Sequence, residues 1–312
     1  MKGILLFLSL FTVLFNNQAR GQSIYSKSYG NKENPAVIYI HGGPGSNSTL
    51  FEATTAQKLA DMGLYVIAYD RRGEGRSADP NATFTFEEAL NDLIDIYKKY
   101  NIAQASIFAH SFGGIVSAYF AERYPEKVKS IILVAALFSQ QESYNHILDS
   151  AEKIYGKKND TTMLEKIQKT RQMPQNTAEY RASVYSFTDG MFDMPEPTME
   201  SIELREIYKN SDFYKNNIRN RNAPAIFYQN EVLNNVDTKP ILKKLKTDGI
   251  KVFGIYGKQD RIFSRKQLND LREITGRENF TLIDNSSHFL YVDQQRIFLK
   301  TFSKYMKKAK YR

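Results

Sequence analysis

Ser111 stands in the stretch AHSFGG (109–114), which has the residue types of a turn that presents a reactive serine. The apolar run before it (105–109) is typical of a buried strand, and the residues after it favour a helix. Small residues two positions before and two positions after the serine, here Ala109 and Gly113, permit a sharp turn that lifts the hydroxyl out of the sheet. The usual pattern has glycine at the first of these positions. The stretch therefore predicts that Ser111 is a nucleophile.

A serine hydroxyl becomes a good nucleophile only when a base accepts its proton and a carboxylate orients that base. The sequence has four histidines, and His288 lies just after the last predicted strand, where a loop could reach Ser111. Asp260 follows the preceding predicted strand. The other three histidines are less well placed. His110 adjoins the serine, and its side chain is expected to point away. His41 opens a glycine-rich loop, and His146 lies in a polar segment. The sequence therefore predicts that His288 is the general base and that Asp260 orients it.

The stretch HGGPG (41–45) follows another predicted strand and combines glycine and proline in a way that can leave backbone N–H groups unpaired. An ordinary strand-to-helix turn is the alternative interpretation. A serine nucleophile needs two N–H donors directed at the oxygen that becomes negative during attack. One donor would come from the residue after the nucleophile, Phe112, and the other from the glycine loop, through Gly43. We therefore predict that these two amides form an oxyanion hole.

Strands and helices alternate along most of the chain, which predicts a mostly parallel, doubly wound α/β sheet. Short apolar, β-branched runs are typical of strands that are buried on both faces of such a sheet. The predicted strands are 36–40, 64–70, 105–109, 128–136, 250–257 and 279–284. The predicted helices are 50–63, 85–100, 112–124, 264–275 and a last one from about residue 294. Residues 139–235 break the alternation and are polar and helix-prone, so we expect a helical insertion between two parts of the core, 22–138 and 236–312.

Five stretches together resemble the α/β-hydrolase fold superfamily, over nearly all of the chain after its N-terminal segment. They are HGGPG, YDRRGEGRS (69–77), AHSFGG, GKQD (257–260) and SHF (287–289). The order serine, aspartate, histidine along the chain is also the order of this superfamily. The glycine loop is similar to that of the proline iminopeptidase family, serine peptidases that release N-terminal residues, often proline, from peptides. The YDRRGEGRS stretch is interpreted as holding the turn after its strand, with substrate binding as the alternative.

This resemblance implies that residues 139–235 form a helical cap over the site, and that cap glutamates bind the free amino group of the substrate. Glu231 lies nearest the matching region and is the predicted substrate-binding residue. Two departures from the family leave strict proline specificity open. Phe112 stands where the family usually has tryptophan, and Ala109 and His110 stand where it usually has two glycines.

The candidate residues predict a serine hydrolase that releases proline or other small or apolar N-terminal residues from short peptides through an acyl-enzyme, with no metal or cofactor. A carboxylesterase or lactonase with the same machinery is the alternative. An acidic cluster facing Ser111 would favour the peptidase, and an apolar cap face would favour the esterase. A non-catalytic binding protein on this fold is disfavoured, because all three candidate catalytic residues are present.

Residues 1–21 have a lysine at position 2, an apolar run and small residues before a cut after Gly21, which is the pattern of a secretory signal peptide. The run is shorter than the roughly twenty residues that a spanning helix needs. We therefore predict export to the periplasm or medium without stable membrane insertion after cleavage; an uncleaved anchor is the alternative.

The chain has no cysteine and a net charge of +9. Disulfides and a cysteine-based zinc site are excluded, no nucleic-acid motif accompanies the basic charge, and the expected partner is a small peptide or ester.

Overall fold

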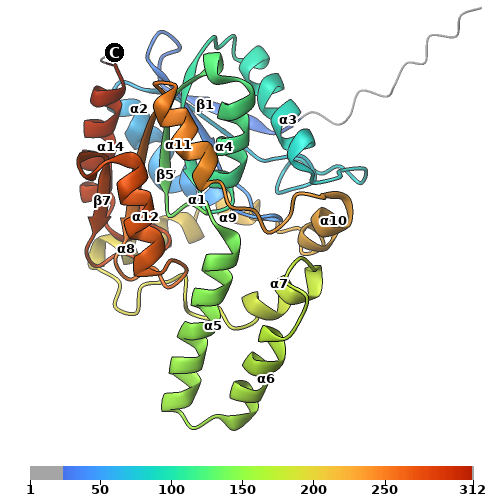
Figure 1. Ribbon diagram of the computed structural model, residues 1–312. Helices are drawn as coiled ribbons and strands as arrows, with labels where there is room; N and C mark the ends of the chain where they lie inside the picture. Colours follow the sequence, from blue (N-terminus) through green and yellow to red (C-terminus); the bar gives the residue numbers. More distant parts are fainter. Residues whose placement is uncertain (1–23, 311–312) are drawn as a thin grey trace, which may run out of the picture.

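The computed structural model describes residues 24–310, so the predicted signal peptide lies outside the described residues. The chain folds around a sheet of seven strands in the order β1-β3-β2-β4-β5-β6-β7 (Figure 1). All neighbouring strands are parallel except β1 and β3. The strands are β1 (Ser26–Tyr29), β2 (Ala36–Ile40), β3 (Tyr65–Tyr69), β4 (Ala105–His110), β5 (Val128–Val134), β6 (Lys251–Gly257) and β7 (Phe280–Ile283). The predicted mostly parallel α/β sheet is confirmed.

Helices cover both faces of the sheet, as the connections between parallel strands require (Figure 1). On one face, four helices pack as successive neighbours: α3 (Phe86–Lys99), α4 (Gly113–Arg123), α11 (Lys239–Thr247) and α12 (Arg265–Thr275). The other face is covered by α14 (Gln295–Lys310) and by one helical segment made of α1 (Thr49–Phe51), the π-helical turn η1 (Glu52–Ala56) and α2 (Gln57–Asp61). The single helix expected over 50–63 thus contains a π-helical turn.

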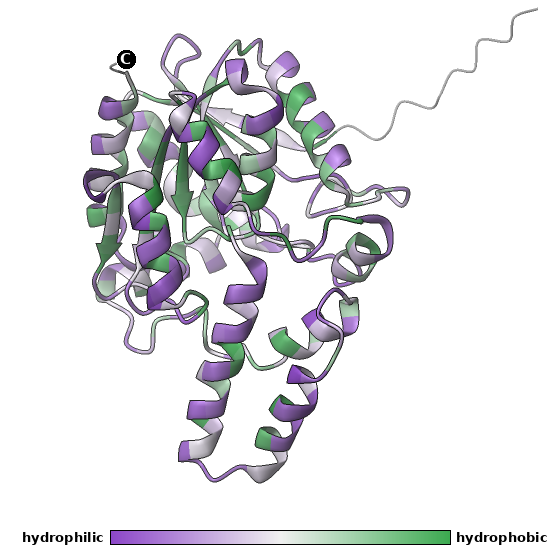
Figure 2. Ribbon diagram, in the orientation of Figure 1, coloured by the Kyte–Doolittle hydropathy of each residue, from purple (hydrophilic) through white to green (hydrophobic). Residues whose placement is uncertain are grey.

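The apolar runs that predict the central strands are buried, because the helices on both faces exclude water from them. Figure 2 shows these strands as hydrophobic and the outer sides of the helices as hydrophilic. Phe108 of β4 packs edge-on against Tyr39 of β2 and Phe51 of α1, with ring centroids 5.0 Å and 5.2 Å away. Burial of each such side chain stabilises the fold by about 1.5–3 kcal/mol. The carboxyl ends of these strands, where the candidate residues lie, are therefore fixed by a packed core.

The segment between β5 and β6 is helical and lies beyond the carboxyl ends of the strands (Figure 1). A bridge between Ser139 and Asp237 joins the two ends of this segment. Its helices are α5 (Gln140–Lys157), α6 (Thr161–Arg171), α7 (Ala178–Tyr185), α8 (Met199–Lys209), α9 (Asp212–Lys215) and α10 (Ala223–Asn230). We call residues 139–235 the cap.

Strand β1 is absent from the sequence-based prediction. Its four residues, SKSY, include three polar ones, and it pairs only with β3, at the edge of the sheet. An edge strand need not be apolar on both faces, so its sequence lacks the signal that marks the inner strands. Within residues 24–310, no helix combines the length and the apolar character needed to cross a bilayer.

Candidate active site

Ser111 occupies a sharp turn between β4 and α4. Its backbone has φ of +53°, in the left-handed region, where an L-residue persists only when its surroundings hold it. Its N–H donates to the carbonyl of Ala135 (3.2 Å), and its carbonyl accepts from the N–H of Leu137 (2.7 Å). A Cβ at Gly113 would lie 2.4 Å from the carbonyl oxygen of Ile40, so glycine is needed for α4 to start this close to β2. The turn therefore presents the Ser111 side chain at the strand end, as the sequence predicts.

Asp260 and His288 form a buried pair beside this turn. They follow β6 and β7, two neighbouring strands, and the Nδ1 of His288 lies 2.9 Å from Oδ2 of Asp260. The other carboxylate oxygen of Asp260 accepts from the N–H of Ile262 at 3.0 Å, which fixes the orientation of the carboxylate. When Nδ1–H donates to Asp260, Nε2 of His288 remains available to accept a proton. His288 and Ser111 line one cavity of about 550 Å³.

The expectation that the side chain of His110 points away from the site is wrong: its ring centroid lies 4.9 Å from that of His288. The side chain of His110 is buried and lines the same cavity, and its Nε2–H donates to the carbonyl oxygen of His288 at 3.1 Å. Burial holds the pKa of His110 well below its ordinary value, so the ring stays neutral. His110 therefore fixes the loop that carries His288. This contact joins residues 178 positions apart in the chain, so no local pattern reveals it.

The glycine loop after β2 keeps two amides free. Within the described residues, the N–H groups of Gly43 and Phe112 donate no hydrogen bond. Gly43 has φ of +139°, and a Cβ there would lie 2.6 Å from Nη2 of Arg71. Both the conformation and the space favour glycine at this position. An oxyanion hole needs such unpaired donors close to the nucleophile.

Arg71 and Glu74 fix this loop from behind. The Arg71 guanidinium donates to the carbonyl oxygens of His41 and Gly42, at 2.6 Å each. Glu74 accepts from the N–H of Gly45 (2.7 Å) and pairs with Arg71 (2.7 Å). Burial raises the pKa of Glu74 to about 7, against the opposing effect of Arg71. The YDRRGEGRS stretch thus holds the turn, as expected, and also positions the candidate oxyanion loop.

Glu231 lies elsewhere. It borders a separate hollow with Phe86 and Tyr119, and it does not line the cavity that contains Ser111. One carboxylate oxygen accepts from the N–H of Phe86 at 2.8 Å, and the other accepts from Leu233 at 2.9 Å. These contacts satisfy the first amide of α3 and attach the cap to the core. This placement speaks against the predicted role of Glu231 in substrate binding.

The cap supplies the outer wall of the cavity, mainly through charged and aromatic side chains. Phe192 packs edge-on against the ring of His288, with centroids 5.0 Å apart, and Tyr185 lies parallel to Phe192. Among the described residues, the charged cap side chains that line the cavity are Arg181, Asp193, Arg205, Lys209 and Arg219. Four of the five are cations, so the wall is neither the acidic cluster that would favour a peptidase nor an apolar face.

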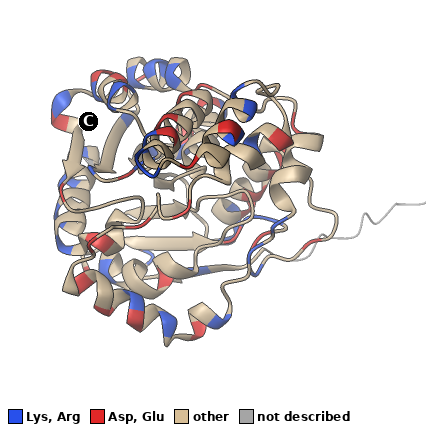
Figure 3. Ribbon diagram, turned by 90° about the horizontal axis from the view of Figure 1, so that it is seen from below, with Lys and Arg blue, Asp and Glu red and all other residues tan. Residues whose placement is uncertain are grey.

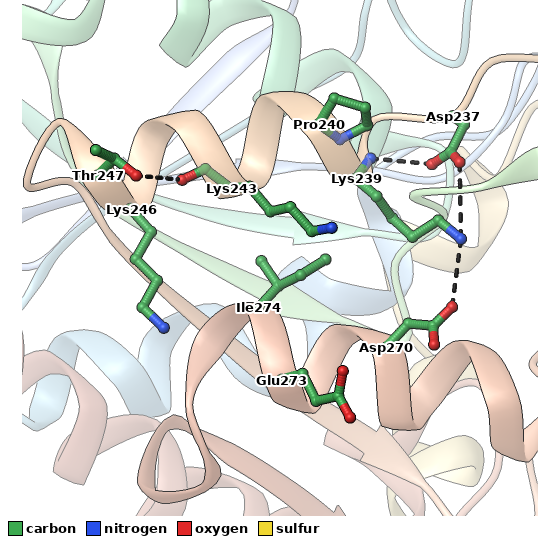
Figure 4. A pocket seen from close by; sticks show the side chains of 9 residues that line it. All are labelled: Asp237, Lys239, Pro240, Lys243, Lys246, Thr247, Asp270, Glu273 and Ile274. Carbon is green, nitrogen blue, oxygen red and sulfur yellow. Dashed lines mark hydrogen bonds and ion pairs between the residues drawn. The ribbon is translucent and has the colours of Figure 1, made fainter.

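Other described parts of the molecule offer less to a reaction. A hollow of about 740 Å³ lies between α11 and α12 and shares no lining residue with the cavity of Ser111; one of its cations, Lys239, is paired with Asp237 and Asp270 (Figure 4). Within residues 24–310, no group of three or more histidine, aspartate and glutamate side chains is placed to hold a metal ion.

The family model described as the alpha/beta hydrolase fold matches residues 35–295. The chain belongs to the α/β-hydrolase family, with its seven-stranded sheet and its serine turn at the end of β4.

Similar proteins include both peptidases and esterases. The proline iminopeptidase of Heyndrickxia coagulans is 24% identical over 309 residues, 95% of this chain and 99% of that protein. An uncharacterized protein of Mycobacterium tuberculosis is 38% identical over 102 residues, 33% of this chain and 29% of that protein. The chain covers less than half the length of the first curated relatives that it matches.

Solved structures support the fold. A carboxylesterase of Nitrososphaera gargenis has a TM-score of 0.62 at 18% identity and covers 93% of this chain and 97% of its own. A proline iminopeptidase-related protein of Thermus thermophilus has a TM-score of 0.62 at 22% identity and covers 90% of this chain and 92% of its own. Since esterases and iminopeptidase relatives fit equally well, the fold does not choose between them.

Proposed function

We propose that this protein is a serine hydrolase that cleaves carboxylic esters through an acyl-enzyme. The proposal rests on the arrangement of three residues. Ser111, on its left-handed turn, shares a cavity with His288, and Nδ1 of His288 lies 2.9 Å from Oδ2 of Asp260. The free amides of Gly43 and Phe112 lie at the same strand ends.

In the proposed reaction, Oγ of Ser111 attacks the acyl carbon while Nε2 of His288 accepts its proton. The carbonyl oxygen becomes an oxyanion and accepts from the two free amides. When the bond to the leaving oxygen breaks, His288 returns the proton to the departing alkoxide, and the acyl group stays on Ser111. Water then repeats the sequence, with His288 taking a proton from the water and returning one to Ser111. Asp260 keeps His288 oriented and stabilises its charged form in both halves.

The cavity wall is the reason for preferring esters to peptide N-termini. A free amino group is an ammonium ion at neutral pH and needs a carboxylate as its partner. Among the described residues, the only cap carboxylate that lines the cavity is Asp193, which already lies 3.6 Å from the guanidinium of Arg205. An ammonium group would therefore enter a wall that is mainly cationic.

An aminopeptidase of the proline iminopeptidase type is the second candidate. It is favoured by the match to the Heyndrickxia coagulans enzyme over nearly all of both chains and by the HGGPG loop. We also propose, from the pattern of residues 1–21, that the enzyme acts after export, on a small ester or peptide.

The first experiment compares the hydrolysis of 4-nitrophenyl butyrate with that of prolyl and alanyl arylamides by the purified protein. We expect ester turnover that falls to background in Ser111→Ala and persists in Ser117→Ala. Ser117 is a matched control, because it is a buried serine of α4 whose hydroxyl is already donated to the carbonyl of Gly114. Arylamide turnover that needs a free amino terminus would establish the second candidate instead. Ester turnover that survives in Ser111→Ala would overturn the proposed mechanism.

A further inference from the structure

The charges that line the candidate active-site cavity are unbalanced. Four cationic side chains, Arg181, Arg205, Lys209 and Arg219, face one cap carboxylate, Asp193. Figure 3 views the molecule from the side of the cap and shows basic and acidic residues interspersed over the helices. The chain as a whole also has a net charge of +9, so the significance of each cavity cation depends on whether it is already paired.

Two of these cations are already neutralised. Arg205 lies 3.1 Å from the buried carboxylate of Asp293 and 3.6 Å from Asp193. Lys209 is exposed and pairs with Glu206 of the same helix at 2.7 Å. These contacts explain the positions of both side chains without a ligand.

Arg181 and Arg219 are not neutralised. Neither forms an ion pair with a described residue. The guanidinium of Arg181, on α7, lies over the ring of Tyr185, 4.5 Å from its centroid, which leaves its N–H donors without a carboxylate. Arg219 lies in the segment between α9 and α10 and is exposed at the same cavity. The two guanidinium groups come from separate cap elements and border the space in which Ser111 and His288 lie.

We infer that this cavity takes a substrate that carries an anionic group, most simply a carboxylate, which binds at Arg181 and Arg219. This inference rests on the proposed ester hydrolysis and names the substrate class for it. A planar guanidinium can donate two parallel hydrogen bonds to a carboxylate, and such charge-assisted bonds are strong where water is partly excluded. The same charges raise the local concentration of anions and disfavour cations.

Binding can be tested without turnover. Calorimetry with the Ser111→Ala protein would compare three small probes of similar length: glutarate, pentanoate and pentylammonium. We expect glutarate to bind at least about tenfold more tightly than the other two, and Arg181→Gln or Arg219→Gln to weaken it about tenfold. Arg221→Gln is the matched control, because Arg221 is an exposed arginine of the same segment that does not line the cavity. Equal binding of the three probes would overturn the inference, and so would glutarate binding that both variants leave unchanged.

Kinetics supply an independent readout. The wild-type protein would be given 4-nitrophenyl pentanoate and the mono-4-nitrophenyl ester of glutaric acid. We expect the anionic ester to have the higher kcat/KM, and this advantage to shrink in Arg181→Gln and as salt is raised toward 1 M. A larger kcat/KM for the neutral ester at every salt concentration would contradict the inference. Absence of turnover with both esters would instead contradict the proposed function, and the binding experiment would still decide the question of the anion site.

Discussion

A single methyl group added at Gly43 should displace the amide that this residue contributes to the candidate oxyanion hole. A Cβ there would lie 2.6 Å from an Arg71 nitrogen that is already engaged with the carbonyl of Gly42 and with Glu74. The loop would have to move, and its free amide would move with it. We therefore expect Gly43→Ala to lower kcat about 10²-fold, with little change in KM.

Gly63→Ala is the matched control for this substitution. Gly63 also has a positive φ, +82°, but nothing lies within 4 Å of where its Cβ would stand. The Gly63→Ala substitution should lower the free energy of unfolding by roughly 1 kcal/mol and leave kcat unchanged. Steady-state kinetics and urea denaturation of both variants would separate the two effects. A wild-type kcat in Gly43→Ala would remove this loop from the oxyanion hole.

His41 should make stability depend on pH. Its ring is fully buried, with Nδ1 2.7 Å from the carbonyl oxygen of Gly42, and burial together with Arg71 lowers its pKa to about 3. The unfolded chain binds a proton near pH 6.5 whereas the folded one does not, so this contribution to stability is present above pH 6.5 and lost as the pH falls toward 3. The free energy of unfolding of the wild type, relative to His41→Asn, should fall by about 1.4 kcal/mol per pH unit between pH 6 and pH 4.

Urea denaturation of both proteins at several pH values would measure this difference. The comparison with His41→Asn is needed because Glu74 and Asp92 change the free energy of unfolding with pH in the opposite direction. Burial raises their pKa values to about 7 and about 6, so their protonation stabilises the fold as the pH falls. A difference between the two proteins that does not vary with pH would show that His41 is not held neutral.

The sequence predicts the positions of residues that follow strands, and it does not predict which residues act through tertiary contacts. Ser111, Asp260 and His288 each follow an apolar run, and parallel strands bring their carboxyl ends to one edge. Arg71 and His110 are identified only by the carbonyl groups that they bind, which belong to other elements. The predicted role of Glu231 rests on the resemblance alone, and its amide partner on α3 is set by how the cap packs on that helix.

At the scale of elements, the start of α3 combines a local cap with contacts that depend on the fold. The Thr85 hydroxyl accepts from the N–H of Glu88, as an N-cap should. The Glu88 carboxylate, however, accepts from the amides of Thr83 and Phe84, and Glu231 of the cap accepts from Phe86. The helix boundary is readable from Thr85, whereas the satisfaction of its amides depends on the fold. The first amide of α3 is therefore bonded to the cap.

Glu231→Ala tests whether this residue is a structural contact or a substrate contact. Loss of its bonds to Phe86 and Leu233 should lower the free energy of unfolding by about 1 kcal/mol, because two backbone donors lose their acceptor. The KM values for the ester and for the prolyl arylamide should not change. Glu200→Ala, at an exposed glutamate of α8, should alter neither stability nor KM. A selective loss of turnover for substrates with a free amino group would instead show that Glu231 binds substrate.

At the scale of the molecule, the sheet and the outer cap differ in how they are held. Strands β4 and β5 are buried along nearly their whole length. In contrast, α5 and α6 project from the body as a helical pair (Figure 1), and α6 buries only Ile167 and Thr170. Elements with few buried apolar contacts open locally at a lower free energy than the core. The sequence predicts the helical character of this region, but the projection of the pair depends on packing that the sequence does not display.

We therefore expect the amides of α6 to exchange with deuterium at least about tenfold faster than those of β4 and β5. Because α7 packs against both α5 and α6 and carries Arg181, opening of the pair would also disturb the inferred anion site. Glutarate should then slow exchange in α6 and α7 of the Ser111→Ala protein, since a ligand that binds only the closed form stabilises it in proportion to its saturation. Exchange mass spectrometry with and without glutarate would measure both effects. Equal protection of α6 and β5 from exchange would mean that the cap and the sheet open only together. If pentylammonium slowed exchange and glutarate did not, the cavity would prefer cations to anions, contrary to the inference.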